Sequence, residues 1–207
     1  MRRHFPFIVI AVLSSAFTAL PARATTVWDE SINGSLSASG ATPTPFTLGL
    51  GTSSILGTVG PNSNHQDWVG ITVPAGLQLS HLVLAAYQST DAQGFFGVQT
   101  GTSFQGSTST AASYLGYTHF GTAAQNGSLP ATNLVGVDLL PIMGDNLNNS
   151  PGSQGFTPPL AAGSYIFLIQ QTGSAATNYR FDFSLTPEPA SALPFAAPLL
   201  LALRRKR

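Results

Sequence analysis

Apolar and polar residues along the middle of the chain follow a two-residue alternation, which is the period of a β-strand. It is clearest between residues 178 and 185, where every second residue is apolar. The apolar positions there are Tyr179, Phe181, Phe183 and Leu185. Such a segment packs one face and exposes the other. The preceding segment, 164–170, is apolar on both faces and predicts a central strand of a sandwich. The connection at 173–177 contains Gly and Ser, so we predict that 164–171 and 178–185 form a hairpin.

A second hairpin is expected around the turn-forming sequence Pro74-Ala75-Gly76. It would pair residues 68–73 with residues 78–87. Weaker strand candidates lie at 95–99 and 133–140, and edge-strand candidates lie at 27–32, 46–50 and 55–59. Between the two ends of the chain, no stretch of ten residues has the 3.6-residue period of a helix. Short strands separated by Gly, Pro and Asn turns predict an all-β sandwich.

Two long polar segments interrupt this pattern. Residues 101–113 are rich in Ser, Thr and Gly, and residues 144–159 are rich in Asn, Pro and Gly. Loops of this length in a compact domain are typically functional or mobile. We therefore expect any binding surface of the sandwich to lie beside one of them.

The N-terminal residues have the pattern of a secretory signal peptide. Arg2 and Arg3 precede an apolar run from residue 5 to residue 20, and the small residues Ala22 and Ala24 suit signal peptidase. We expect a signal helix, cleavage after Ala24, and a mature domain that begins with the next residue. An N-terminal membrane anchor is the alternative, but the run is short for a bilayer span of about 20 residues.

The C-terminal residues combine three features that have no use inside a folded core. Pro187-Glu188-Pro189 is followed by an apolar stretch, 190–203, and then by a basic cluster. The cluster consists of Arg204, Arg205, Lys206 and Arg207. The prolines hold Glu188 in an extended segment. The apolar stretch, interrupted by Pro194 and Pro198, predicts a short helix that is marginal as a membrane span. By the positive-inside rule the basic end would stay cytoplasmic, leaving Pro-Glu-Pro on the outer face.

This order of motif, apolar stretch and basic end over residues 187–207, paired with a signal peptide, resembles the PEP-CTERM protein-sorting signal of Gram-negative bacteria. The apolar stretch departs from the family because it contains prolines where Gly and Leu are usual. The resemblance implies export to the cell surface or the extracellular matrix through transient inner-membrane insertion. It also implies signal peptidase and an exosortase-like membrane enzyme as partners, and an association with exopolysaccharide. An uncleaved C-terminal membrane anchor is the alternative.

Three segments of the body resemble the bacterial pre-peptidase C-terminal type domain, which is attached to secreted enzymes or surface proteins. They are an Asp-aromatic strand ending in an Ala-Gly turn at 67–76, an Ala-Gly-Ser-Tyr strand within 160–169, and a final strand at 179–185. The resemblance implies a single jelly-roll-like antiparallel β-sandwich over residues 25–186. Many members have an acidic stretch where this chain has 81–87, so any metal role of that stretch does not transfer.

The formal net charge of zero hides a strongly acidic body. Seven of the eight basic residues lie in the two terminal segments, which leaves Arg180 as the one base of residues 25–186. Seven of the eight acidic residues lie in that body, whose net charge is therefore 1 − 7 = −6. Nucleic acids and anionic lipids bind clustered Lys and Arg, so this composition argues against both as partners. The chain has no cysteine, and an exported domain without disulfides must be held by its core.

No catalytic or zinc motif stands out in the body. A hydrolase would need His65 and Asp67 beside one of the many serines, but no Gly-x-Ser-x-Gly sequence is present. His65, His81 and His119 lack the close spacing of zinc ligands. We therefore predict no catalytic residues, no metal ligands and no resident cofactor, with calcium left open.

Two loop features leave ligand binding open. Asp145-Asn-Leu-Asn-Asn-Ser150, with Asp138 nearby, offers oxygen ligands for calcium, but it lacks the Gly and the terminal Glu of an EF-hand, which favours a simple turn. Tyr114, Tyr117 and Phe120 form an aromatic cluster beside the first long loop and are a candidate ligand surface. Our leading hypothesis is a non-enzymatic, surface-sorted protein that acts in envelope or matrix interactions. A carbohydrate- or calcium-dependent adhesion module is the alternative, and a secreted hydrolase is the third hypothesis.

Overall fold

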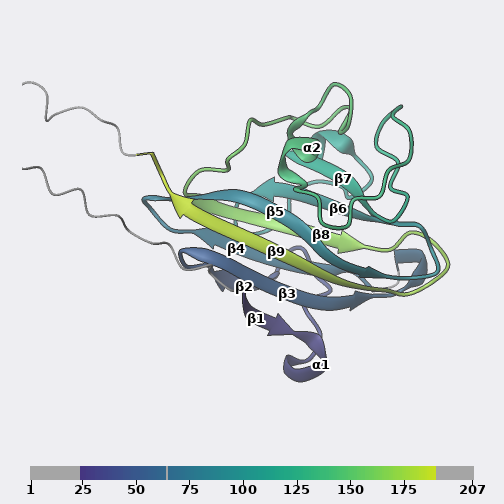
Figure 1. Cartoon of the computed structure of the whole chain (residues 1–207), viewed down its shortest axis with the longest axis horizontal. Helices are drawn as coiled ribbons and strands as arrows, with labels where there is room; N and C mark the ends of the chain where they lie inside the picture. Colours follow the sequence, from purple (N-terminus) through teal and green to yellow (C-terminus); the bar gives the residue numbers. More distant parts are fainter. Residues whose placement is uncertain (1–23, 64, 190–207) are drawn as a thin grey trace, which may run out of the picture.

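The computed structural model describes residues 24–63 and 65–189, and these residues form two β-sheets packed face to face (Figure 1). The strands are β1 (Thr25–Asp29), β2 (Thr44–Thr47), β3 (Gly51–Val59), β4 (Asp67–Val73), β5 (Leu77–Gln88), β6 (Gln93–Thr100), β7 (Gly116–Gly121), β8 (Gly163–Gln170) and β9 (Thr177–Pro187). The helical segments are α1 (Glu30–Asn33), α2 (Leu140–Gly144) and two 3₁₀ turns, Pro61–Ser63 and Ala111–Ser113. The predicted all-β sandwich is confirmed. The expected signal helix and C-terminal helix lie outside the described residues.

The first six strands alternate between the two sheets. The strand order is β1-β3-β9-β5 in one sheet, called sheet A below, and β2-β4-β8-β6-β7 in the other, called sheet B. Because each step along the chain changes sheet and reverses direction, β1 runs parallel to β3 and β2 runs parallel to β4. All other pairs are antiparallel, so the sandwich is not wholly antiparallel as the sequence suggested.

The last two strands complete both sheets. β9 lies between β3 and β5, and β8 lies between β4 and β6. The apolarity of β8 on both faces was correctly interpreted as that of a central strand, since six of its residues are buried. The predicted hairpin between 164–171 and 178–185 is wrong, because these strands belong to different sheets. The predicted pairing of 68–73 with 78–87 is wrong for the same reason. Turn residues specify that the chain reverses, but not whether it returns to the same sheet.

Three further predictions differ from the structure. Residues 133–140 form no strand; they run as a loop with one bridge, from Asp138 to Val83, and then enter α2. β3 is an interior strand of sheet A, not an edge, whereas β1 and β2 are edge strands as expected. β7 was not predicted, because its aromatic residues Tyr117 and Phe120 lie three positions apart and do not follow the two-residue period of a strand. The two long segments 101–113 and 144–159 are confirmed as connections outside the sheets.

Aromatic rings from both sheets interlock in the core. The inward side chains of β9 are buried, with Phe181 at 0% exposure. Its ring lies 4.4 Å from Phe96 and 5.1 Å from Phe120, centroid to centroid, and Phe183 lies 5.4 Å from Phe167. Buried aromatic residues contribute large apolar areas and favourable ring-edge contacts. This cluster holds the two sheets together in a chain that has no cysteine for disulfide bonds.

Both described ends of the chain leave sheet A at the same end (Figure 1). In the strand register, Thr25 of β1 lies opposite Ser53 of β3, which in turn lies opposite Phe183 of β9. The first residue of β1 therefore lies two strands across the sheet from the last residues of β9. None of the helices among the described residues is long and apolar enough to cross a bilayer.

Truncating the centre of the core should strongly destabilise the sandwich. Phe181→Ala removes a fully buried ring and leaves a cavity between the sheets, so we expect the free energy of unfolding to fall by about 3–5 kcal/mol. Thr186→Ala, on the outward face of the same strand, should change it by less than about 0.5 kcal/mol. Equilibrium urea unfolding measures both. Similar losses for the two variants would contradict the assignment of the core.

Candidate functional site

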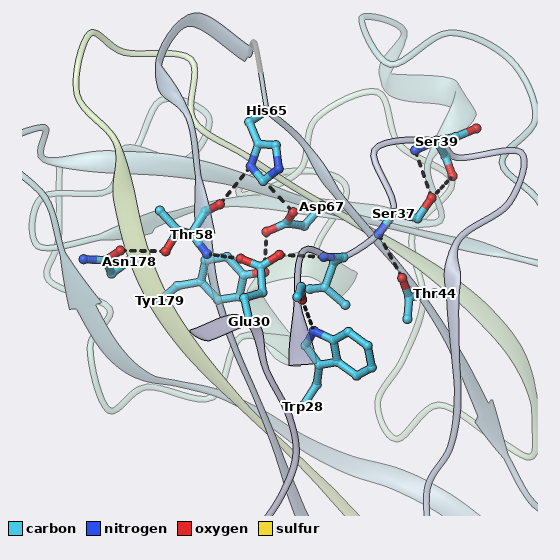
Figure 2. A network of polar contacts seen from close by, with 12 residues as sticks. Trp28, Glu30, Ser37, Ser39, Thr44, Thr58, His65, Asp67, Asn178 and Tyr179 are labelled. Atoms are coloured by element: carbon cyan, nitrogen blue, oxygen red, sulfur yellow. Dashed lines mark hydrogen bonds and ion pairs between the residues drawn. The ribbon is translucent and has the colours of Figure 1, made fainter. Parts of the chain in front are cut away.

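A buried carboxylate is the most unusual group of the sandwich. Asp67 begins β4, and its side chain has 0% exposure. The Tyr179 hydroxyl of β9 donates a hydrogen bond of 2.6 Å to Asp67 Oδ2 across the two sheets. Among the described residues, Oδ1 has no hydrogen-bond partner. Figure 2 shows these groups within a larger polar network that also includes Glu30 and His65.

Glu30 ties the N-terminal segment to the sandwich. Its Oε2 accepts from the backbone N–H of Thr58 in β3 at 2.7 Å, and its Oε1 accepts from the N–H of Leu36 at 2.6 Å (Figure 2). The ladder between β1 and β3 ends one step earlier, at Asp29 opposite Leu56. The Glu30 carboxylate therefore accepts hydrogen bonds where the backbone pairing of β1 and β3 stops, and it brings a negative charge close to Asp67.

His65 approaches the same carboxylate from the loop before β4. Its Nδ1 lies 2.9 Å from the carbonyl oxygen of Thr58 and 3.9 Å from Asp67 Oδ1. A carbonyl oxygen can only accept, so Nδ1 must carry the hydrogen and donate it. The Nδ1 atom is thus unable to take a proton from a neighbouring hydroxyl. Among the described residues, no serine hydroxyl is hydrogen-bonded to His65 or His119, so these residues do not assemble the triad that a serine hydrolase would need.

Burial controls the protonation of this site. The pKa of Asp67 is raised to about 7, mainly by burial. The hydrogen bond from Tyr179 and the nearby His65 lower it, whereas the negative charge of Glu30 adds to the increase. Burial also raises the pKa of Tyr179, and the neighbouring Asp67 adds to this effect. The pair therefore keeps the tyrosine proton throughout the physiological range, and Asp67 holds its own proton up to about neutral pH.

Close packing around the pair depends on a glycine. Gly57 of β3 lies directly opposite Tyr179 in the strand register. A Cβ atom at this position would collide with the Tyr179 hydroxyl and would approach Glu30 Oε2. Only glycine leaves enough room for the tyrosine ring to reach Asp67. The hydrogen bond between Tyr179 and Asp67 thus links β9 to β4, and Glu30 at the start of α1 links the N-terminal segment to β3.

The other histidines lie in separate surroundings. The exposed His81 of β5 pairs with Asp138 at 2.8 Å, and the ring of His119 packs edge-on against Phe95 at 5.8 Å. Burial lowers the pKa of His119, which favours its neutral form. Within residues 24–63 and 65–189, no three His, Asp or Glu side chains converge in a way that could hold a metal ion.

The Asp145 loop is closed by its own hydrogen bonds. Asp145 Oδ1 accepts from the backbone N–H groups of Leu147 and Asn148, and Oδ2 accepts from the side-chain amides of Asn148 and Asn149. These donors lower the pKa of Asp145. The groups around the Asp145 carboxylate are thus N–H donors. A calcium ion bound there would need further oxygen ligands instead. This geometry favours the simple Asx-rich turn over a calcium loop.

The structure places the three predicted aromatic residues in different surroundings. Phe120 has 0% exposure and lies in the core, because β7 directs residues 116, 118 and 120 inward. It cannot contribute to a surface. Tyr117 points outward and is half-buried, and Tyr114 is 2% exposed beneath the first long loop. The residue that joins them is Phe95 of β6, whose ring stacks on Tyr117 at 5.6 Å. Its position between Gly94 and Gly97 was the available signal, since glycines beside an aromatic residue leave room for neighbouring rings.

The segment predicted to be a sorting motif, Pro187-Glu188-Pro189, lies at the end of β9. Pro187 is the last strand residue, and the side chains of Pro187, Glu188 and Pro189 are all exposed. The N–H of Glu188 donates to the carbonyl of Gly76 at 2.9 Å, in the turn between β4 and β5. Ala24 precedes β1. The other predicted residues of the two signals lie outside the described residues; they are Ala22, Arg204, Arg205, Lys206 and Arg207.

Comparisons with known proteins add no assignment. No protein-family model matches the chain, and no curated protein matches it in sequence.

The buried carboxylate predicts an unusual dependence of stability on pH. The unfolded chain releases the Asp67 proton near pH 4, whereas the folded chain keeps it to about pH 7. The contribution of Asp67 to stability should therefore be largest in acid, fall between about pH 4 and pH 7, and then level off, with a total loss of up to about 4 kcal/mol. Asp67→Asn keeps the shape and the acceptor for Tyr179, and it should flatten this decline. Urea unfolding between these pH values tests it.

Glu188→Gln is the control for that experiment, because it neutralises an exposed carboxylate that takes no part in the network. It should reproduce the wild-type curve. An unchanged decline in Asp67→Asn would show that another group causes the dependence on pH.

Proposed function

We propose that this chain is an exported, surface-sorted, non-enzymatic protein of a Gram-negative bacterium and a substrate of an exosortase-type enzyme. The observation that carries the proposal is the position of Pro187-Glu188-Pro189. The motif is exposed and begins where β9 leaves the sheet, so a membrane enzyme could reach Glu188 without opening the core. Signal peptidase and the sorting enzyme are its processing partners, and the cell envelope or extracellular matrix is its destination.

The Pro-Glu-Pro motif begins at the end of β9, where it removes no hydrogen bond between β9 and β3. The ladder between β3 and β9 stops at Leu185, opposite Gly51, while β5 continues to Pro187 through Leu77. Proline has no N–H to donate, so it is tolerated only where a strand has no further ladder bond to make. Beyond it, one backbone hydrogen bond from Glu188 to Gly76 holds the motif. Breaking that bond costs little compared with opening the aromatic core.

The position of both described ends supports attachment at one pole. Thr25 and Pro187 leave sheet A at the same end of the sandwich (Figure 1). If either end of the chain were held near a membrane, this end of the sandwich would face the bilayer and the opposite end would face the exterior. The sandwich would have the same orientation before and after removal of a signal peptide.

The charge of the body supports attachment through the tail alone. The body carries a net charge of −6, and its one base, Arg180, is engaged with Asp182 through two nitrogens at 2.8 and 3.0 Å. No unpaired cation therefore remains on residues 25–186 to attract anionic headgroups. Retention at a membrane then depends on the residues that follow the sandwich.

Substitution of the motif tests the proposal in the native host. Glu188→Ala removes the acidic side chain of the motif, while the backbone bond to Gly76 can remain. We expect the variant to keep the tail after residue 189 and to accumulate in the inner membrane, whereas the wild type loses the tail and reaches the surface or the medium. Intact-mass measurement and cell fractionation give both readouts.

Thr186→Ala is the matched control, because it changes the neighbouring residue and leaves Pro-Glu-Pro intact. It should be processed like the wild type. Normal processing and localisation of Glu188→Ala would refute the sorting proposal.

A further inference from the structure

The outer face of sheet B carries a continuous layer of aromatic rings. It begins with Trp68 of β4, which lies 4.9 Å from Phe104 in the first long loop. Phe104 lies 5.4 Å from Tyr114, and Tyr114 lies 5.5 Å from Phe95 of β6. Phe95 then stacks on Tyr117 of β7. Sheet faces on the outside of a sandwich are usually polar, but here the first long loop covers the layer. Trp68 and Tyr114 are buried in a second small core, and Phe95, Phe104 and Tyr117 are only partly buried against it.

The first long loop is held firmly over this layer. The side chain of Gln99 in β6 accepts from the N–H of Gln105 at 2.7 Å and donates to the carbonyls of Gln105 and Ser113. The N–H of Phe104 donates to Gly40 at 2.7 Å. Gln99 is itself buried. A loop fixed at both ends in this way gives its neighbours a defined shape.

A pocket of about 160 Å³ lies between the loop and the layer. The rings of Phe95, Tyr114 and Tyr117 line one part of it, and the exposed loop residues Thr108 and Ser109 line another, together with Ala111. The Phe95 and Tyr117 rings are inclined by only 25°.

Both tyrosine rings are fixed in place. The hydroxyl of Tyr114 donates to the carbonyl of Thr108 at 2.9 Å, and the hydroxyl of Tyr117 donates to the carbonyl of Pro151 at 2.8 Å. Gly97 lies beneath the Tyr114 ring, and a Cβ atom there would collide with it. Rigid aromatic side chains lose little conformational entropy on binding.

We propose that this pocket binds one neutral pyranose ring, such as the terminal residue of a polysaccharide. The apolar C–H face of a sugar matches the surface of Phe95 and Tyr117, and its hydroxyls match Thr108 and Ser109 at the rim. The volume corresponds to roughly five water molecules, which suits a single ring rather than a larger organic ligand.

The charge around the pocket selects a neutral sugar. None of its lining residues is charged, and the body as a whole carries a net charge of −6. A uronic acid would meet this field without a partner for its carboxylate. Two other cavities are less suitable: one of about 140 Å³, lined by residues between Ala124 and Asn149, contains no aromatic ring, and one of about 80 Å³ beside Pro43 is half the size.

The pocket remains accessible when the protein is attached by its tail. It lies on the outer face of sheet B, whereas both described ends of the chain leave sheet A. Binding is therefore independent of sorting, and it can be measured on protein whose tail has not been processed.

Titration of the full chain with methyl glycosides tests the proposal. The chain is purified in a polyoxyethylene detergent, because sugar detergents would compete. Methyl glucoside, galactoside and mannoside are the neutral probes, and methyl glucuronide is the charged probe. We expect saturable binding of at least one neutral probe, with a Kd on the order of 1 mM, as is reasonable for a single ring, and weaker binding of the glucuronide. Saturation-transfer NMR and shift titrations measure both.

Variants assign the binding to this pocket. Tyr117→Leu removes part of the aromatic surface, and Ser109→Trp fills the pocket from its exposed rim without touching the core; each should weaken binding about tenfold or more. Phe46→Leu, a half-buried aromatic substitution in β2, is the matched control and should bind like the wild type. Melting curves confirm that each variant is folded. Absence of saturable binding to every neutral probe, wild-type affinity in Ser109→Trp, or tighter binding of the glucuronide would each overturn the proposal.

Discussion

The structure depends on the insertion of β9 between β3 and β5. This strand gives sheet A its continuity, contributes Phe181 and Phe183 to the core, and carries the tyrosine that reaches Asp67 in sheet B. Its last residue is also the first residue of the Pro-Glu-Pro motif. One strand therefore determines the packing of the core, the hydrogen bond to Asp67 and the position of the Pro-Glu-Pro motif. Displacement of β9 would disturb all three.

The same topology constrains when the chain can fold. β3 pairs with β9, which follows it by more than a hundred residues, since Gly51 pairs with Leu185 and Val59 pairs with Thr177. Sheet B has a similar dependence, because β4 and β6 are joined through β8. Non-local pairing of this kind folds slowly, and neither sheet can close until its late strand is present. The two sheets therefore close only after β8 and β9 have been synthesised.

The features of the fold that could be predicted are those that depend on the residue pattern of one strand. The alternation around Phe181 specifies an exposed and a buried face, and the two-sided apolarity of β8 specifies a covered strand; both agree with the structure. The pairing of strands was not predictable in the same way. A turn such as Pro74–Gly76 reverses the chain equally well within one sheet or between two, so the sequence offered no local feature to separate these cases.

The candidate sites show the same limit. Asp67 and Tyr179 are 112 residues apart in sequence, and their hydrogen bond arises only when the two sheets pack. Phe120 was assigned to a surface because it is close to Tyr117 in sequence, but β-strand geometry sends neighbouring residues to opposite faces at odd separations. The correct partner, Phe95, lies across the strand pair opposite His119. The register of two paired strands determines which of their side chains are neighbours. This register cannot be predicted from the sequence of either strand alone.

The buried carboxylate explains how a chain of few charges keeps its two layers in one alignment. An apolar contact between sheets tolerates sliding by a fraction of a residue, whereas the 2.6 Å bond between Tyr179 and Asp67 exists in one position only. Burial favours the protonated form of Asp67, because an unpaired charge there would cost far more than the hydrogen bond contributes. Gly57 is then required for the same alignment, since it provides the space in which the tyrosine crosses from one sheet to the other. Hydrophobic packing supplies the stability of the sandwich, and this polar link supplies its register.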